Sequence, residues 1–305
     1  MVLNRQHLET ALQDVRERLS VGDGFSGLEL PQENSVHLFD QLPSTNQRLW
    51  ELLNQGATSG TVAIATQQTA GRGQWGRQWQ STVGGLYLSL ALTPNMPASN
   101  STQLTLCSAW GIAIALRTYN IPVFLKWPND LLLLGRKLGG ILTETRVQQG
   151  QITKAIVGVG INWSNAVPES GINLQSFYEQ ELNPAVTGLE MLAAIAIQGL
   201  NLGYQRWSKA GIQALLPSYL ELLDSLGCQV MVDGTPGIVT GVTPTGELRV
   251  RLNSIQTQAH TPNDGSKIAT TNSDEANFPD EKVTPMPRGR EIYLKPGTIN
   301  LGYHQ

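Results

Sequence analysis

The sequence predicts an α+β fold in which helices flank a mixed, mostly antiparallel sheet, followed by a small β-rich unit. Helical and strand patterns come in mixed order up to about residue 224. From Gly227 the pattern changes to short, closely spaced strands. A chain of 305 residues with 40% hydrophobic residues can bury a large core and a small one. We therefore expect a larger domain at residues 1–224 and a smaller one at residues 225–305.

A helix and a connection are expected to fill residues 1–35. Hydrophobic residues recur at helical spacing over residues 4–19, which predicts an amphipathic helix. A short strand is expected near residues 36–39. Ser44-Thr45-Asn46 is a typical helix cap, and the helix that follows should run to Asn54 and stop at Gly56.

The rest of the larger domain carries most of the sheet. The expected strands lie at residues 61–66, 86–92, 123–127, 131–134, 138–147 and 152–162. The expected helices lie at about residues 101–119, 189–209 and 212–223. Gly135-Arg136 is predicted to turn one hairpin, and residues 148–150 the next. Residues 163–187 have the composition of a loop.

The smaller domain is predicted to be a small barrel. Its expected strands lie at residues 229–232, 237–240, 247–252 and 291–294. Residues 253–288, rich in Thr, Asn, Asp and Pro, interrupt these strands and are predicted to be a disordered insertion.

Composition argues against several classes of function. A net charge of −3 and a pI near 5.8 are unusual for a general nucleic-acid binder. Cys107 and Cys228 lie far apart, and the four histidines do not cluster, so a metal site of His and Cys is not expected. The N-terminus lacks the apolar core of a signal peptide, and no apolar run is long enough for a membrane span. We expect a cytoplasmic protein without a membrane partner.

The most informative segment is the loop Gly71-Arg72-Gly73-Gln74-Trp75-Gly76-Arg77-Gln78-Trp79. It lies in a stretch, residues 52–129, that contains no Asp or Glu. Its glycines let backbone N–H groups approach a ligand, and its two arginines suit a carboxylate or a phosphate. Its two tryptophans indicate a contact rather than a solvated surface loop, which is the structural alternative. The loop is therefore predicted to wrap an anion.

Two common nucleotide-binding motifs do not explain this loop. The spacing Gly71-x-Gly73-x-x-Gly76 matches the dinucleotide-binding fingerprint, but the chain continues into a strand instead of a helix. No acidic residue follows at the distance that a ribose contact requires. A P-loop sequence is absent from the whole chain.

Short motifs before and after the loop resemble, in this order, those of the biotin–protein ligases. Each motif is weak alone, but the ordered set over residues 42–162 is specific. The motifs, apart from the loop, are Leu42-Pro-Ser-Thr-Asn46, Gln68-Thr-Ala-Gly71, Lys126-Trp-Pro-Asn-Asp130, Arg136-Lys-Leu-Gly-Gly-Ile-Leu142 and Gly158-Val-Gly-Ile-Asn162. The resemblance implies a catalytic domain of the class II synthetase-like biotin ligase fold and an SH3-like C-terminal barrel.

The resemblance also implies an activity with biotin and ATP as substrates. The biotin carboxylate attacks the α-phosphate of ATP, which gives biotinyl-5′-AMP and pyrophosphate. A lysine of a biotin carboxyl carrier protein, by default that of acetyl-CoA carboxylase, then takes the biotinyl group and AMP leaves. Mg²⁺ is expected to share the phosphate charge.

The family's site residues carry over onto matching positions of this chain. Arg72 and Lys137 are the candidate catalytic residues, which hold the biotin carboxylate and the phosphoryl oxygens. The other candidate biotin-binding residues are Ser44, Thr45, Gln68 and Gly140. Beside Arg72, the candidate nucleotide-binding residues are Gly73, Arg77, Trp79, Lys126, Asn129, Asp130 and Asn162. The loop that closes over the adenylate comprises Gly71, Gly73, Gln74, Trp75 and Gly76. No side chain is assigned to a metal.

Some of these residues have a structural alternative. Ser44-Thr45-Asn46 can be a helix cap only, and Asn162 can simply end a strand. At the level of the whole protein, the alternatives are a lipoate–protein ligase or octanoyltransferase of the same fold, and a non-catalytic biotin-binding sensor.

The chain also departs from the family. Gln74-Trp75 stands where relatives often carry basic residues, which suggests weaker retention of the adenylate. Lys295 stands where an Arg facing the nucleotide is common. Only about 40 residues precede Leu42, too few for a winged helix-turn-helix, so no DNA-binding role is expected. Both a monomer and a sheet-edge homodimer remain open.

Overall fold

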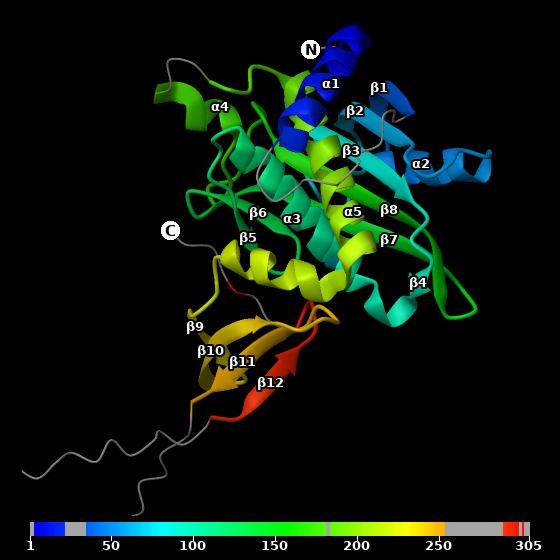
Figure 1. Ribbon diagram of the computed structural model, residues 1–305. Helices are drawn as coiled ribbons and strands as arrows, with labels where there is room; N and C mark the ends of the chain where they lie inside the picture. The colour runs from blue at the N-terminus through cyan, green and yellow to red at the C-terminus, as the bar shows by residue number, and fades with distance from the viewer. Residues whose placement is uncertain (1–2, 22–34, 181–183, 254–288, 299–300, 302–305) are drawn as a thin grey trace, which may run out of the picture.

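The computed structural model describes residues 3–21, 35–180, 184–253, 289–298 and 301. Their strands form an eight-stranded sheet and a separate four-stranded sheet (Figure 1). The predicted insertion at 253–288 lies, apart from its first residue, outside the described residues.

The larger sheet is mixed but mostly antiparallel, as predicted. Its main path runs β1-β2-β3-β8-β7-β6-β5, and β4 pairs with β8. Strand β1 pairs parallel to β2, whereas the other pairs are antiparallel. The strands are β1 Val36–Leu42, β2 Val62–Gln68, β3 Gly85–Leu92, β4 Met96–Pro97, β5 Phe124–Lys126, β6 Asp130–Leu133, β7 Arg136–Gln148 and β8 Gln151–Asn162.

Helices cover both faces of this sheet. On one face lie α3 (Thr102–Thr118) and α5 (Leu189–Glu221), with α1 (Arg5–Val21) packed on α5 (Figure 1). On the other face α2 (Thr45–Asn54) forms its own hydrophobic cluster with β2, β3 and β8. Because both faces are covered, β3 is buried along its whole length and reads as a nearly continuous hydrophobic run.

Helices α3 and α5 approach each other at glycines. A Cβ at Gly203 would overlap the carbonyl oxygen of Cys107, and one at Gly111 would overlap that of Gly199. The close approach buries most of α3, including its cysteine and its tryptophan. The close packing of α3 on α5 therefore requires glycine at these two positions.

We expect Gly203→Ala to lower the free energy of unfolding by about 1–3 kcal/mol, because the added methyl group must push two packed helices apart. Chemical denaturation measures the effect. Gly188→Ala is the matched control, since a Cβ there would meet only the carboxylate of Glu190 at 3.4 Å. Equal denaturation midpoints for the two variants would contradict this account of the helix crossing.

The structure refines some sequence-based boundaries. The two helices predicted at 189–209 and 212–223 appear as the two parts of α5, which meet at Gly211 with φ 75° and ψ 172°. The hairpin predicted to turn at Gly135-Arg136 turns one residue earlier, at Leu134 and Gly135. Both residues have positive φ, 51° and 71°, which a two-residue turn of this kind requires. The predicted loop at 163–187 contains the short helix α4 (Leu174–Phe177) and the 3-10 turn η3 (Tyr178–Gln180).

The smaller sheet has the antiparallel order β12-β11-β10-β9. This confirms the predicted β-rich unit, although the strands that the structure describes do not close into a barrel. The unit is tied to the larger one, because Trp127 donates its indole N–H to the carbonyl of Gly246 at 2.9 Å. The strands are β9 Gln229–Val232, β10 Thr235–Val242, β11 Leu248–Leu252 and β12 Glu291–Leu294.

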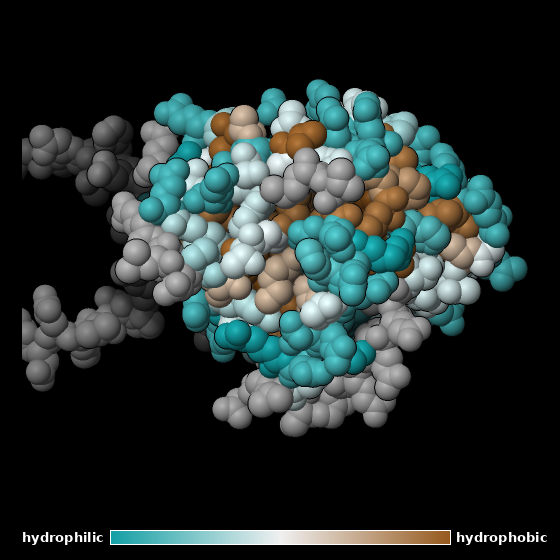
Figure 2. All heavy atoms as spheres, turned by 90° about the horizontal axis from the view of Figure 1, so that it is seen from above, coloured by the Kyte–Doolittle hydropathy of each residue, from teal (hydrophilic) through white to brown (hydrophobic). Residues whose placement is uncertain are grey.

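Seen from the α1 end, the surface is largely hydrophilic, with hydrophobic residues showing between the polar ones (Figure 2). Among the residues with a described structure, no helix is both long and apolar enough to cross a membrane.

Candidate active site

A cavity of about 570 Å³ brings most of the predicted site residues together. The predicted residues that line it are Ser44, Thr45, Gln68, Arg72, Gly73, Gln74, Trp75, Arg77, Trp79, Lys126, Asn129, Asp130, Lys137 and Gly140. Gly71, Gly76 and Asn162 do not line it. The segments far apart in the sequence therefore form one site.

The glycine-rich loop is a tight hairpin over one side of this cavity. The N–H of Gly73 donates to the carbonyl of Arg77 at 2.7 Å, and the N–H of Trp79 donates to that of Gly71 at 3.0 Å. A Cβ at Gly71 would overlap the hydroxyl of Ser81, so only glycine permits this close approach. At the tip, the 3-10 turn η1 (Gln74–Gly76) holds Trp75 in a left-handed conformation with φ 59°.

One end of the cavity is lined mainly by uncharged polar side chains and is called the uncharged end here; the cation beside it, Arg72, is paired with Glu144. Gln68 accepts from the backbone N–H of Thr45 at 2.8 Å and donates to the hydroxyl of Ser81 at 2.9 Å. Beneath them the fully buried Ser89 donates to the hydroxyl of Thr45 or to the side-chain oxygen of Asn46. These bonds fix the polar side chains before any ligand arrives.

Ser44 lies at the N-cap position of α2, as the sequence predicted. Its backbone is extended, and its side chain makes no capping hydrogen bond. The residue is only 5% exposed and lines the cavity. Its hydroxyl is therefore not committed to the helix terminus, which favours the binding role over the purely structural alternative.

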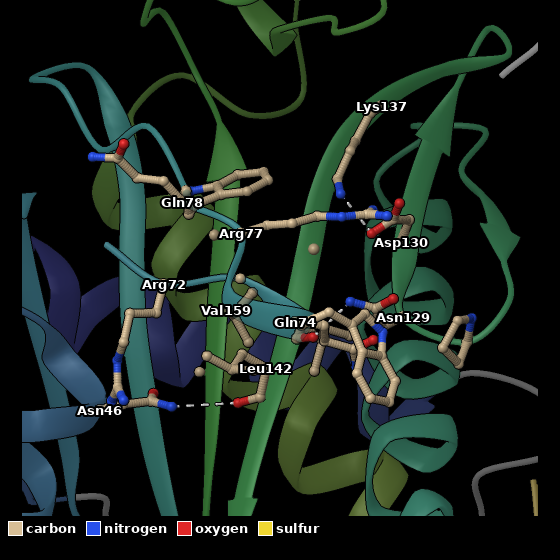
Figure 3. A pocket seen from close by; sticks show the side chains of 18 of the residues that line it. Asn46, Arg72, Gln74, Arg77, Gln78, Asn129, Asp130, Lys137, Leu142 and Val159 are labelled. Atoms are coloured by element: carbon tan, nitrogen blue, oxygen red, sulfur yellow. Dashed lines mark hydrogen bonds and ion pairs between the residues drawn. The ribbon is translucent and has the colours of Figure 1, made fainter. Parts of the chain in front are cut away.

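The other end of the cavity is cationic. The Lys137 ammonium lies 2.7 Å from a carboxylate oxygen of Asp130 (Figure 3). Figure 3 also shows Arg77 extending from the loop toward Asp130. Lys126, at the end of β5, is 8% exposed, and this burial lowers its pKa to about 8. Asp130 opposes that decrease, whereas the charges of Lys137 and Arg77 add to it.

Asn129 holds the segment that carries these charges against β7. It donates its amide to the carbonyl of Ile141 at 2.9 Å and accepts from the N–H of the same residue at 2.9 Å. These two bonds fix Asp130, the next residue, near Lys137 at the start of β7. Gly140 lies under the pair: a Cβ there would be 3.4 Å from Asp130 and 3.5 Å from the Lys137 side chain.

Trp79 packs on the backbone of β8. A Cβ at Gly160 would overlap its indole nitrogen, so the ring lies directly on this glycine. The indole N–H is buried and has no hydrogen-bond partner among the described residues. The Lys137 ammonium lies 5.4 Å from the ring centroid, within cation–π distance. Trp79 thus forms a wall of the cavity beside its cationic end.

Asn162 and Arg72 both have side-chain partners within the protein. Asn162 is buried and does not line the cavity, and its amide donates to the carbonyl of Ile172 at 3.2 Å. Arg72 lines the cavity, but its guanidinium forms an ion pair with Glu144 at 2.8 Å. In Figure 3 the Arg72 side chain runs toward Asn46 and away from Lys137.

Several lining residues were not assigned from the sequence. Among them are Gly158 and Gly160, which are separated by one residue inside β8. Glycine inside a strand often marks the close approach of another group. The glycines within the predicted strand at residues 152–162 therefore indicate these two site residues. The C-terminal residues Gly297, Thr298 and Leu301 also line the cavity. A Cβ at Gly297 would lie 2.8 Å from the ring of Trp75, so the C-terminal turn meets the loop tip.

No group of three or more His, Cys, Asp or Glu side chains in the described ranges could hold a metal ion. What the cavity offers is a fixed polar end, a cationic end and a glycine-rich loop across its mouth. This arrangement suits an anionic ligand that also carries an uncharged polar group.

Comparison with known proteins identifies the class to which such a site belongs. A family model described as the biotin/lipoate A/B protein ligase family matches residues 38–162. The bifunctional ligase/repressor BirA of Escherichia coli strain K12 is 32% identical over 232 residues, which are 72% of this chain and 70% of that protein. The chain therefore belongs to the biotin/lipoate A/B protein ligase family.

Two other relatives with ligase names are also similar to this chain. The bifunctional ligase/repressor BirA of Bacillus subtilis is 41% identical over 125 residues, 40% of this chain and 38% of that protein, so the chain spans less than half of this relative. The biotin–[acetyl-CoA-carboxylase] ligase of Mycobacterium tuberculosis is 29% identical over 232 residues, 74% of this chain and 80% of that protein.

A solved structure confirms the fold expected from the resemblance. The biotin protein ligase from Aquifex aeolicus, in complex with biotin and ATP, matches with a TM-score of 0.59 and 27% sequence identity. The match covers 72% of this chain and 91% of that structure. The larger sheet with its flanking helices thus has the biotin ligase fold.

Proposed function

We propose that this protein is an ATP-dependent biotin–protein ligase, which forms biotinyl-5′-AMP and transfers the biotinyl group to a lysine of a biotin carboxyl carrier protein. The observation that carries the proposal is one cavity with two chemically different ends. The uncharged end suits the ureido ring of biotin, and the cationic end suits a carboxylate beside a phosphate chain. Residues 1–224 would form the catalytic domain and residues 225–305 an SH3-like domain beside it.

In the first reaction a carboxylate oxygen of biotin attacks the α-phosphorus of ATP, and pyrophosphate leaves with the bonding electron pair. Two anions must meet, so the site has to offset their repulsion. Lys137 and Lys126 supply positive charge at this point, while Ser44, Thr45 and Gln68 hold the other end of biotin. Trp79 offers a flat apolar wall against which the adenine can stack.

In the second reaction the amine of the carrier lysine attacks the carbonyl carbon of the mixed anhydride. An amide bond forms, AMP leaves, and the amine loses a proton. The glycine-rich loop and the C-terminal turn, which meet at Trp75 and Gly297, would exclude water from the anhydride until the carrier arrives.

The described residues do not form a preformed site for the expected Mg²⁺. Asp130 is the carboxylate among the described cavity-lining residues, and it is already paired with Lys137. Mg²⁺ can instead arrive bound to the phosphates of ATP, keeping most of its water ligands. In both reactions the roles assigned here belong to the protein's own groups.

The carrier of acetyl-CoA carboxylase is the proposed protein substrate, since the M. tuberculosis relative is named for it. Location in the cytoplasm and absence of a DNA-binding role stay predictions, and a monomer and a homodimer are both compatible with the proposal.

Exchange of labelled pyrophosphate into ATP tests the proposal. We expect exchange that requires biotin and Mg²⁺, and much less exchange with lipoate or octanoate. Exchange that prefers lipoate would favour the lipoate–protein ligase alternative. Biotin binding without any exchange would favour the biotin-binding sensor. The hydrogen-bonded end formed by Thr45, Gln68 and Asn46 favours biotin, because a lipoyl ring lacks hydrogen-bonding groups.

The buried Lys126 predicts a pH dependence. Its pKa of about 8 lies below the ordinary value, so its positive charge is present below pH 8 and is lost as the pH rises through 8. We expect the KM for ATP to rise roughly tenfold between pH 7 and pH 9.5 in the wild type. Lys126→Arg should flatten this profile, because arginine keeps its charge over the whole range. Parallel profiles for the two proteins would contradict this role of Lys126.

The loop tip predicts weak retention of the adenylate. Gln74 and Trp75 line the cavity without adding charge. Gln74→Arg should therefore slow the release of biotinyl-5′-AMP, by roughly tenfold for one added charge–phosphate contact. Stopped-flow measurement of adenylate dissociation tests it, and an unchanged dissociation rate would contradict the role of charge at this position.

A further inference from the structure

The two cations that the resemblance assigns to the biotin carboxylate are held apart. Lys137 pairs with Asp130 at 2.7 Å, whereas Arg72 pairs with Glu144 at 2.8 Å. In the close-up the Arg72 side chain follows the uncharged end of the cavity, beside Asn46, and not the end at which Lys137 lies (Figure 3). The Arg72 guanidinium therefore already has an acidic partner within the protein.

Glu144 is fixed more firmly than Arg72. It lies on β7 opposite Ile156 of β8, in the middle of the longest strand pair. Its second carboxylate oxygen accepts a hydrogen bond from the indole N–H of Trp50, on α2, at 2.8 Å. The side chain of Glu144 is 23% exposed, compared with 49% for Arg72. The carboxylate is thus the fixed member of the pair, to which the arginine of the loop is attached.

Trp50 is held in turn from its far side. The Arg146 guanidinium lies 4.3 Å from the centroid of the Trp50 ring and donates to the side-chain oxygen of Asn54 at 2.6 Å. A chain of contacts therefore runs from α2 through Trp50 and Glu144 to Arg72. It connects the helix that begins at the cavity with the loop that covers the cavity.

This chain of contacts fixes the part of the loop nearest to the uncharged end. Arg72 forms a backbone bridge with Gln78, and its neighbour Gly73 closes the hairpin through the carbonyl of Arg77. Gly71, on the other side, packs against Ser81. A Cβ added at Gly71 would lie 3.2 Å from the side-chain amide of Gln68. Anchoring the Arg72 side chain to β7 thus holds the backbone of residues 71–73 beside Gln68.

We propose that Glu144 is a positioning residue, which tethers Arg72 to β7 and thereby holds the glycine-rich loop over the end of the cavity that takes the uncharged ring of biotin. The inference rests on the proposed function. Arg72 then acts through its attachment to Glu144, and its guanidinium is not the group that binds the carboxylate. That carboxylate is held by Lys137, at the opposite end.

The tether predicts an effect on biotin but not on ATP. Glu144→Gln keeps the side-chain size and the acceptor for Trp50 but removes the ion pair. We expect its KM and Kd for biotin to rise about tenfold, while the KM for ATP changes less than about threefold. Glu51→Gln is the matched control, because Glu51 forms an ion pair of 2.9 Å with Arg48 on α2 and does not line the cavity.

A double-mutant cycle separates a tether from a ligand contact. If Arg72 acts only through Glu144, the double variant Arg72→Gln with Glu144→Gln should bind biotin as weakly as either single variant, and no more weakly. If Arg72 contacts the ligand directly, the two losses should add. Additive losses, or a Kd for biotin unchanged in Glu144→Gln, would overturn the proposal.

An exchanged pair gives a second, independent test. The variant Arg72→Glu with Glu144→Arg reverses the ion pair. It is made together with Trp50→Phe, so that no indole N–H is left facing the new guanidinium, and we expect it to recover much of the biotin affinity that Arg72→Glu loses in the same Trp50→Phe background. If the Arg72 guanidinium itself had to contact the biotin carboxylate, a glutamate at position 72 could not replace it and the biotin affinity would not recover. Lack of recovery in a variant that unfolds at the wild-type temperature would therefore overturn the tether. Calorimetric binding of biotin to the wild type, measured first, distinguishes this failure from failure of the proposed function.

Discussion

Lys137→Ala is expected to lower biotin-dependent exchange of pyrophosphate into ATP by at least about a hundredfold. Lys137 is the cation best placed to hold the two reacting anions together, because it lies at the start of β7 with its ammonium 2.7 Å from Asp130. Its backbone is fixed as well, since its N–H donates to the carbonyl of Ser170 at 2.9 Å and its own carbonyl accepts from Ile172 at 2.9 Å. The charge is therefore held at a set position before the substrates bind, which is what electrostatic catalysis requires.

The control for this variant is Lys154→Ala. Lys154 lies on β8 opposite Arg146 and does not line the cavity, so its loss should leave exchange unchanged. Lys137→Arg keeps the charge but not the shape of the head group, and we expect an intermediate rate. If Lys137→Ala binds biotin and ATP and exchanges pyrophosphate at the wild-type rate, the cationic end of the cavity is not where the reaction occurs.

The removal of Lys137 also affects Asp130, which is 9% exposed and loses an ion pair. A fall in activity could therefore come from a displaced carboxylate instead of a missing cation. Lys137→Ala combined with Asp130→Asn separates the two causes. If the missing cation is responsible, the double variant should stay as inactive as the single one. If it regains exchange, the carboxylate that has lost its contact with Lys137 is responsible.

The parts of the fold that the sequence predicts correctly are those that local patterns determine. The turn at residues 148–150 is one of them, because Gln149 and Gly150 both adopt positive φ, 50° and 77°, as a two-residue hairpin demands. The break at Gly211 is another, since glycine adopts φ 75° without a steric cost. In both cases a few neighbouring residues are enough to predict the turn or the break.

The parts of the site that the sequence does not predict depend on contacts between distant residues. Glu144 lies in Thr143-Glu144-Thr145, which has the composition of the solvent-facing half of a strand. Only the folded chain brings Trp50 and Arg72 to it. The contacts of Asn162 depend on the fold in the same way, because a polar residue at a strand end can face more than one direction. Its amide donates to the carbonyl of Ile172 at 3.2 Å, a contact that the local sequence does not indicate.

Trp79 lies against the backbone of β8 at Gly160. Gly160→Val should reduce the affinity for ATP by more than about tenfold and also destabilise the protein, because a side chain at this position occupies the space of the indole. Ala155→Val, at a buried position of the same strand outside the cavity, is the control for added β-branched bulk. An unchanged KM for ATP in Gly160→Val would mean that Trp79 is not a wall of the nucleotide site.

Destabilisation alone would not prove the contact, because any substitution in a central strand can weaken the sheet. A cycle with Trp79 resolves this. Gly160→Ala should cost about 1–3 kcal/mol of unfolding free energy in the wild-type background and much less in Trp79→Ala, where the ring is no longer there to be displaced. Equal costs in both backgrounds would place the effect in the sheet itself. Unequal costs would show that Gly160 is required because Trp79 must lie against the backbone of β8, one wall of the cavity in which ATP is proposed to react.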